Sequence, residues 1–122
     1  MPDDLVNMHG VPVLVCTADG RTLRNEQDAL DVIGDAFGHQ ARWVAVPAAR
    51  LDDAFFRLNT RVAGDIMQKF VNYGIGMAVI GDISPHTTTS PALRSLVLES
   101  NRGRHIWFVK DIDDLHNRLK ER

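Results

Sequence analysis

The sequence predicts an α/β domain with a mainly parallel sheet and an antiparallel N-terminal hairpin. Two patterns alternate along the chain: short apolar runs typical of buried strands, and longer stretches whose apolar residues recur at helical spacing. Repeated βα units favour parallel strands joined by right-handed crossovers, so the predicted order is β-β-α-β-α-β-α-β-α. The 122 residues are a usual length for one domain, and we expect a single domain over residues 1–122.

The N-terminal hairpin is predicted at residues 5–8 and 11–17, around the turn His9-Gly10. Antiparallel strands can be joined by so short a connection. Pro12 suits a strand start or a sheet edge, because proline has no N–H to donate to a neighbouring strand. The chain's only cysteine, Cys16, ends an apolar run and is interpreted as a small buried hydrophobic residue.

The first predicted helix covers residues 25–37, and a short strand at 42–46 follows it. Asn25 is a suitable N-cap residue, and acidic residues in the first turn suit the positive end of the helix dipole. Gly38 is expected to end the helix. Its predicted apolar face consists of Ala29, Leu30, Ile33, Ala36 and Phe37.

The second helix is expected from Asn59 or Thr60 to residue 73, with Gly74 as its stop. Its apolar residues at helical spacing are Val62, Ala63, Ile66, Met67 and Phe70. The following run at 75–80 is almost entirely apolar, which predicts a strand buried on both faces, as in the centre of a parallel sheet.

The last third of the chain predicts two more helices and one strand. Ser90-Pro91 is a strong helix start, because a hydroxyl N-cap precedes a proline at the first helical position. That helix closes near residues 101–103, and a buried strand follows at 105–109. Asp111 is predicted to cap a final helix whose inner face carries Ile112, Leu115 and Leu119.

Composition argues against several classes of function. The formal net charge is -2, with no extended basic run, so binding to nucleic acid or to an anionic membrane through bulk charge is disfavoured. One cysteine excludes a disulfide framework, and no apolar run approaches the roughly 20 residues of a membrane span. The N-terminus lacks a stretch like a signal peptide, so we expect a cytosolic protein without a nucleic-acid or membrane partner.

Function is expected beyond the carboxyl ends of the parallel strands, where ligands gather in open α/β sheets. Three loops leave that edge, at residues 47–59, 81–90 and 110–111, and two helices begin beside them. The second loop is the richest in polar side chains. The residues predicted to form a ligand-binding or partner-binding edge are Asp53, Asn59, Thr60, Asp82, Ser84, His86, Thr87 and Ser90.

Each of these residues also has a purely structural interpretation, which we weigh more heavily. Asp82 suits a turn in which its carboxylate bonds to its own backbone, and Thr60 suits a plain N-cap. Residues as close in sequence as Asp82, Ser84 and His86 rarely reach the geometry of a catalytic triad, and no nucleophile-elbow pattern is present. No phosphate-binding loop and no pair of histidines at i, i+4 occurs. We therefore expect no catalytic residue, metal site or cofactor.

Three blocks of sequence carry a resemblance to a known family. They are FFRLNTRVAGDIMQKF at 55–70, AVIGD at 78–82 and ESNRG at 99–103. Their order and spacing resemble the bacterial domain-of-unknown-function family 4180, and the likeness runs from about residue 26 onward. The resemblance implies no activity, because that family is essentially uncharacterised.

The predicted order of elements is also similar to the STAS domain of anti-sigma-factor antagonists, a module that docks protein partners. The likeness places a phosphorylatable hydroxyl at Thr60, although Asn59 stands where the STAS pattern has an acid. The leading hypothesis is therefore a non-enzymatic regulatory module that binds a protein or a second copy of itself. The alternative is a small-molecule or anion-binding domain, or a small enzyme, using residues 82–90 with Asn59 and Thr60. In a third hypothesis, Trp43, Trp107 or Phe55 forms an oligomer interface.

Overall fold

The sheet has five strands in the order β1-β2-β3-β4-β5, and it confirms the predicted fold class. A computed structural model describes residues 3–121 of the chain. The hairpin strands β1 (Asp4–Met8) and β2 (Val11–Val15) pair antiparallel. The strands β3 (Trp43–Pro47), β4 (Gly76–Ile80) and β5 (Ile106–Val109) extend the sheet from β2 in parallel.

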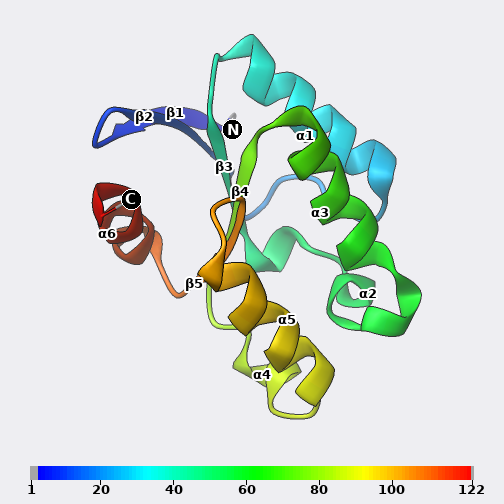
Figure 1. Ribbon diagram of the computed structural model, residues 1–122. Helices are drawn as coiled ribbons and strands as arrows, with labels where there is room; N and C mark the ends of the chain where they lie inside the picture. The colour runs from blue at the N-terminus through cyan, green and yellow to red at the C-terminus, as the bar shows by residue number, and fades with distance from the viewer. Residues whose placement is uncertain (1–2, 122) are drawn as a thin grey trace.

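Three helices cover one face of the sheet, and a fourth covers the other (Figure 1). The first three are α1 (Glu26–Gly38), α3 (Val62–Tyr73) and α5 (Pro91–Arg102). They share a face because the strand order never reverses, so successive right-handed crossovers all pass on the same side. The last helix, α6 (Ile112–Glu121), follows the edge strand and lies against the opposite face.

Each face of the sheet has its own apolar layer. Under α1, α3 and α5, the largest fully buried side chains include Phe55, Phe70 and Ile66. Under α6, the rings of Trp43 and Trp107 stack with centroids 4.2 Å apart, beside Leu115 and Leu119. The central strands are therefore buried on both faces, as their unbroken apolar runs predict.

Several predicted helix ends are confirmed by their hydrogen bonds. The Asn25 side chain accepts from the Asp28 N–H at 3.0 Å, and Ser90 Oγ accepts from the Leu93 N–H at 3.1 Å. Asp111 does the same for α6, with Asp114 N–H at 2.8 Å. Gly74 ends α3 in the left-handed conformation, with φ of 72°.

The end of α1 departs from the prediction. Phe37 was expected on the buried face but is 51% exposed, and its ring meets Tyr73 edge-on at the surface. Val32 takes its place in the core. Gly38 still belongs to α1, and the residue with positive φ after the helix is Gln40, at 59°. Thus the helix continues beyond the expected stop.

The loops predicted at the carboxyl ends of β3 and β4 contain short helices. The connection after β3 contains η1 (Ala48–Arg50), α2 (Asp53–Phe56) and η2 (Leu58–Thr60). The connection after β4 contains α4 (Ser84–Thr87). Phe55 and Phe56 from α2 are both buried, so this connection is part of the core.

The free edge of β5 is closed by one side chain. Met77 N–H donates to His105 O and Gly81 N–H to Val109 O, so the polar groups of Phe108, three residues beyond His105, point away from β4. The Asn101 side chain from α5 pairs with both of them. Its Oδ1 accepts from Phe108 N–H at 2.7 Å, and its Nδ2 donates to Phe108 O at 3.1 Å.

Candidate functional site

Two connections meet at the carboxyl edge of the parallel strands. The ring of Phe56, from α2, stacks on the ring of His86, from α4, with centroids 4.0 Å apart and planes 7° apart. This contact joins the connection after β3 to the connection after β4, as the sequence predicts for strand ends at one edge. Figure 1 shows α2 and α4 at the same end of the molecule, with the N-terminus of α5.

Two hollows lie on either side of α4. The first, of about 430 Å³, lies between α2 and α4, and its lining includes Asn59, His86 and Ser90. The second, of about 440 Å³, lies between α4, α5 and the ends of β4 and β5. Together they place six of the eight predicted edge residues around α4: Asn59, Asp82, Ser84, His86, Thr87 and Ser90.

The second hollow has an apolar interior and a charged rim. Ile83, Val97, Leu98, Phe108 and Val109 supply its apolar lining. Its rim also carries the side chains of Asp82, Arg94 and Lys110, so both signs of charge are present. Leu98 from α5 is 62% exposed, the largest value among the exposed large apolar residues described.

The polar groups of the second loop are used within the loop. Asp82 Oδ1 accepts from the Ser84 N–H at 2.9 Å, which is the self-bonded turn expected of this aspartate. Hydrogen bonds from the Ser84 backbone, then from its side chain, hold the pKa of the Asp82 carboxyl below its ordinary value. Arg94 donates to Thr87 O at 2.7 Å, and Ser90 Oγ caps α5. These contacts keep the groups in place without aiming them at a common point.

The prediction that Thr60 caps the following helix is wrong. The helix α3 begins at Val62, and Arg61, with φ of 66°, breaks the backbone between η2 and α3. The Thr60 hydroxyl instead faces two carbonyl oxygens, Ala54 O at 2.6 Å and Arg57 O at 2.7 Å. Its proton thus ties η2 to α2, and its oxygen also accepts a long hydrogen bond from the Val62 N–H, at 3.3 Å.

Two other predicted edge residues are plain surface groups. Asp53 is exposed at the first position of α2, where Asp52 is the cap and accepts from the Ala54 N–H. Asn59 is exposed in η2 and lines the hollow beside His86. Neither Asp53 nor Asn59 has a side-chain hydrogen bond within residues 3–121.

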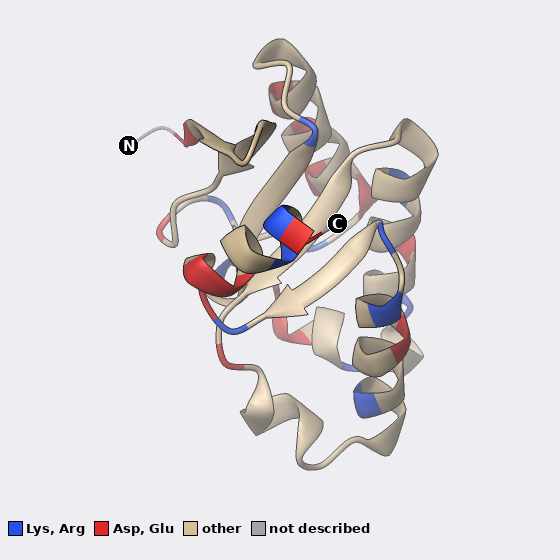
Figure 2. Ribbon diagram, turned by 60° about the vertical axis from the view of Figure 1, so that its left-hand side comes forward, with Lys and Arg blue, Asp and Glu red and all other residues tan. Residues whose placement is uncertain are grey.

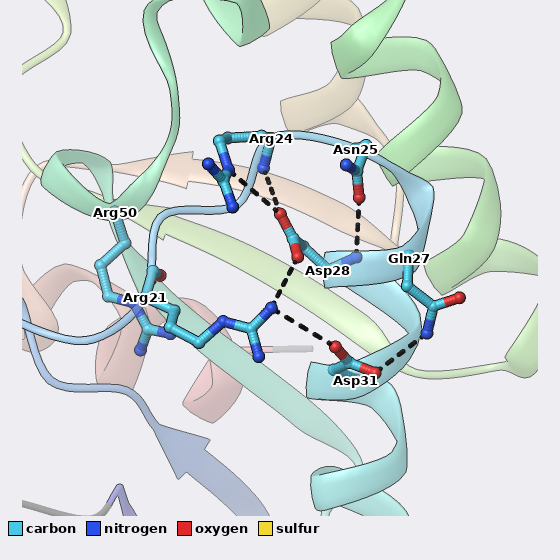
Figure 3. Close-up of polar contacts among 7 residues, drawn as sticks. All are labelled: Arg21, Arg24, Asn25, Gln27, Asp28, Asp31 and Arg50. Carbon is cyan, nitrogen blue, oxygen red and sulfur yellow. Dashed lines mark hydrogen bonds and ion pairs between the residues drawn. The ribbon is translucent and has the colours of Figure 1, made fainter.

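A polar cluster around the buried side chains of Asp28 and Arg50, near the ends of β2 and β3, was missed by sequence reasoning (Figure 3). Arg50 is 6% exposed and donates to Arg21 O at 2.7 Å. Asp28, in the first turn of α1, accepts from Arg21 Nη2 at 3.0 Å and from the Arg24 N–H at 2.9 Å. The cluster fixes the loop before α1 against the connection after β3. Only an acidic first turn signalled it in the sequence, and that pattern is typical of any helix start.

The third hypothesis about an oligomer interface is not supported by burial. Trp43, Trp107 and Phe55 are each 7% exposed or less, too little for any of them to form an interface with a second copy. In the described part of the chain, residues 3–121, no three His, Cys, Asp or Glu side chains are grouped as metal ligands would be. No helix within that part is both long and apolar enough to cross a bilayer.

The fold and this edge define an α/β domain whose parallel strands end at two open hollows. The family model described as "Domain of unknown function (DUF4180)" matches residues 8–119. The chain therefore belongs to the DUF4180 family, as the three sequence blocks predicted. Searches of curated proteins and of solved structures returned no match.

Proposed function

We propose that this chain is a non-enzymatic protein-interaction module that binds its partner at the apolar hollow between α4 and α5. The observation that carries the proposal is the exposed Leu98 beside a hollow lined by Val97, Phe108 and Val109. Exposed apolar surface with a polar rim is typical of a protein-binding site. The partner is a protein segment that inserts an apolar side chain into this hollow.

Charge on the rim supports a peptide-like occupant. Asp82 lies just after the end of β4, and Lys110 lies just after the end of β5. Both are exposed and line the hollow. Neither has an ion pair among the residues that the structure describes. A partner segment with one basic and one acidic residue flanking its apolar side chain would complement both. Such rim charges set orientation and association rate more than they set affinity.

The contacts of the polar loop favour binding over catalysis. A general base must reach the proton that it removes, and its pKa must lie near the working pH. The Asp82 carboxylate is occupied by the Ser84 N–H, and its pKa is lowered, which weakens it as a base. His86 stacks flat on Phe56 at the far side of α4. The alternative, a small-molecule or anion site at Asp82–Ser90, therefore has fewer free groups than the sequence suggested.

The proposal includes a regulatory role in the bacterial cytosol, by analogy with STAS domains. Its support is the order of elements: an antiparallel hairpin at the edge, then βα units with parallel strands. Fold-level analogy is weaker support than the site itself. The phosphorylated-hydroxyl switch at Thr60 is not part of the proposal, because the proton of that hydroxyl is directed at two backbone carbonyls, Ala54 O and Arg57 O.

The test compares two surface substitutions of the same kind. Leu98→Ser removes the exposed apolar residue of the hollow, and Val71→Ser does so on α3, where Val71 is 41% exposed. Both variants should melt close to wild type, because surface changes cost little. We expect a partner identified with wild type to bind Val71→Ser equally and Leu98→Ser at least about tenfold more weakly, measured with purified proteins.

Equal binding of the partner by both variants would contradict the proposal. So would a thermal-shift screen in which small molecules stabilise wild type but not Leu98→Ser, since that result favours the small-molecule alternative. Size-exclusion chromatography over a range of concentrations tests a second copy as the occupant. In that case Leu98→Ser alone should lose the larger species.

A further inference from the structure

A third hollow lies at the opposite edge of the sheet, where the parallel strands begin. It has a volume of about 250 Å³. One wall is the hairpin turn at residues 10–12, and the other is formed by Arg104, His105 and Trp107. Its floor includes Gly74 and Gly76, and the rings of Trp43 and Trp107 line it from the α6 side.

Gly76 lets the Trp43 ring pack directly against β4 beside the hollow. A Cβ atom at position 76 would come within 2.3 Å of the Trp43 ring. That ring cannot retreat freely, because it is stacked on Trp107. Register places the beginnings of β3 and β5 on either side of Gly76: its N–H donates to Arg42 O at 3.0 Å, and the next N–H, of Met77, donates to His105 O at 2.8 Å. The side chains that precede β3 and β5 therefore flank a residue without one.

Those flanking side chains concentrate positive charge. Arg42, Arg104 and His105 line the hollow and are exposed, while no Asp or Glu of residues 3–121 lines it. Other arginines, such as Arg50 and Arg102, have carboxylate partners, but Arg42 and Arg104 have none among the described residues. The whole chain has a formal net charge of -2, so this local excess of cations is not a consequence of composition.

An unused hydrogen-bond donor adds to the charge. Trp43 is 7% exposed, and its indole N–H has no acceptor among residues 3–121, whereas Trp107 Nε1 donates to Gly103 O at 2.9 Å. Every fully buried side-chain nitrogen or oxygen in the described part of the chain has a partner. The Trp43 N–H must therefore reach solvent, and Trp43 is a lining residue of the hollow. A nearly buried N–H that is left open to solvent is a natural donor to a ligand.

We propose that this hollow binds a small organic oxyanion, a phosphate or a carboxylate attached to a compact planar group. The guanidinium groups of Arg42 and Arg104 match the geometry of such oxyanions, and His105 and the Trp43 N–H supply further donors. Trp43 and Trp107 line the hollow together with Val11 and Pro12 and give the planar group an apolar surface to contact. A volume of about 250 Å³ admits a group of this size and excludes a dinucleotide. The site is independent of the interaction surface at the other edge.

A purely structural role for the same charges makes a different prediction. The helices α3 and α5 end near this edge, and cations near helix C-termini stabilise the partial negative charge there. If the role is purely structural, removing Arg42 or Arg104 lowers stability slightly and leaves anion binding unchanged. If the hollow is an anion site, removing either arginine also weakens anion binding.

The experiment titrates the full chain with phenyl phosphate, benzoate, inorganic phosphate and, as a neutral control, phenol. Heteronuclear NMR reads the two indole N–H signals, because the chain has two tryptophans and both line the hollow. We expect one or both of the aromatic anions to shift the Trp43 signal more than the Trp107 signal, and phenol to shift neither. Comparison of phenyl phosphate with benzoate distinguishes the phosphate from the carboxylate.

The matched variants are Arg42→Gln, Arg104→Gln and Arg102→Gln. All three remove one charge from an exposed side chain, but Arg102 pairs with Glu99 and does not line the hollow. We expect the first two to weaken binding at least about tenfold and the third less than about twofold. Absence of any anion-dependent shift up to about 10 mM ligand, or equal weakening by all three variants, would overturn the proposal.

Discussion

The two edges of the sheet use their polar side chains in opposite ways. At the carboxyl edge, Asp82, Ser90 and Thr60 form hydrogen bonds to nearby backbone and leave apolar surface open around Leu98. At the amino edge, Arg42 and Arg104 have no ion-pair partner among residues 3–121 and surround a hollow. A loop with many polar side chains therefore does not always offer groups that are free to bind a ligand. Whether a side chain is free depends on its contacts in the folded chain, which the sequence alone does not reveal.

The largest effect is expected at Gly76, which forms the floor of the amino-edge hollow. Gly76→Ala should lower the free energy of unfolding by about 3 kcal/mol, because the new methyl group overlaps the stacked Trp43 ring. The control is Gly64→Ala in α3, where a Cβ meets nothing within 4 Å. That variant should gain up to about 1 kcal/mol from helix propensity.

Urea denaturation of both glycine variants measures these free energies. If Gly76→Ala proved as stable as wild type, the tryptophan pair could shift freely. The hollow would then be less rigid than the stacked rings indicate. The amino edge would no longer differ in rigidity from the carboxyl edge, which is formed by the connections after β3 and β4.

A smaller effect is expected at the carboxyl edge, where Thr60 donates a hydrogen bond to the α2 region. Thr60→Ala should cost roughly 1–2 kcal/mol, since the one hydroxyl proton shared between Ala54 O and Arg57 O is lost. Thr60→Asp should cost at least as much, because a carboxylate has no proton to donate to Ala54 O or Arg57 O. Thr60→Ser should keep most of the stability.

Thermal melts of the three Thr60 variants decide between a donor and a cap. An N-cap role predicts that Asp substitutes well for Thr. Ser90→Ala provides the comparison at a confirmed cap and should cost about 1 kcal/mol. A fully stable Thr60→Asp protein would restore the N-cap interpretation that the structure contradicts.

The smallest effect concerns pH and the buried thiol that follows β2. Burial, and next the negative charge of Asp3, raise the pKa of Cys16 from 9.0 to about 12. Above about pH 9 the thiol of the unfolded chain ionises while the folded one stays protonated, so stability falls as the pH rises through 9. At pH 10 this ionisation lowers the free energy of unfolding by about 1 kcal/mol.

Cys16→Ala isolates this contribution, because the other titrating groups are unchanged. Its stability relative to wild type, from urea curves at pH 8 and pH 10, should be more favourable at the higher pH. Identical differences at the two pH values would show that Cys16 does not change its pKa on folding.

Much of the fold followed from local pattern. The spacing of Val62, Ile66 and Phe70 predicts the inner side of α3, and Ser90 with Pro91 marks the start of α5, because these signals depend on residues close in sequence. Phe37 was misplaced because helical periodicity gives a stripe but not where the neighbouring elements stop covering it. Thr60 was misplaced because Arg61 adopts a left-handed conformation that its residue type does not announce.

The position of the candidate site could be predicted from the sequence, but not which of its side chains are free of hydrogen bonds. Strand ends meet at one edge in any such sheet, so the grouping of Asn59, Asp82 and His86 near α4 could be anticipated. Which of these groups stay free could not be anticipated, because hydrogen bonding depends on distances of a few tenths of an ångström. The amino-edge hollow was overlooked for a different reason. Arg42 and Arg104 are ordinary surface residues until the register with Gly76 places them on either side of a gap.

The Asn101 side chain has a consequence for how the protein behaves at high concentration. An unpaired strand edge is a template on which a second chain can add its own strand. Asn101 occupies the outward N–H and C=O of Phe108, so β5 offers no such template at its centre. Replacing it by leucine would open that edge, and the chain would then be expected to form ordered aggregates while its monomer fold stayed intact.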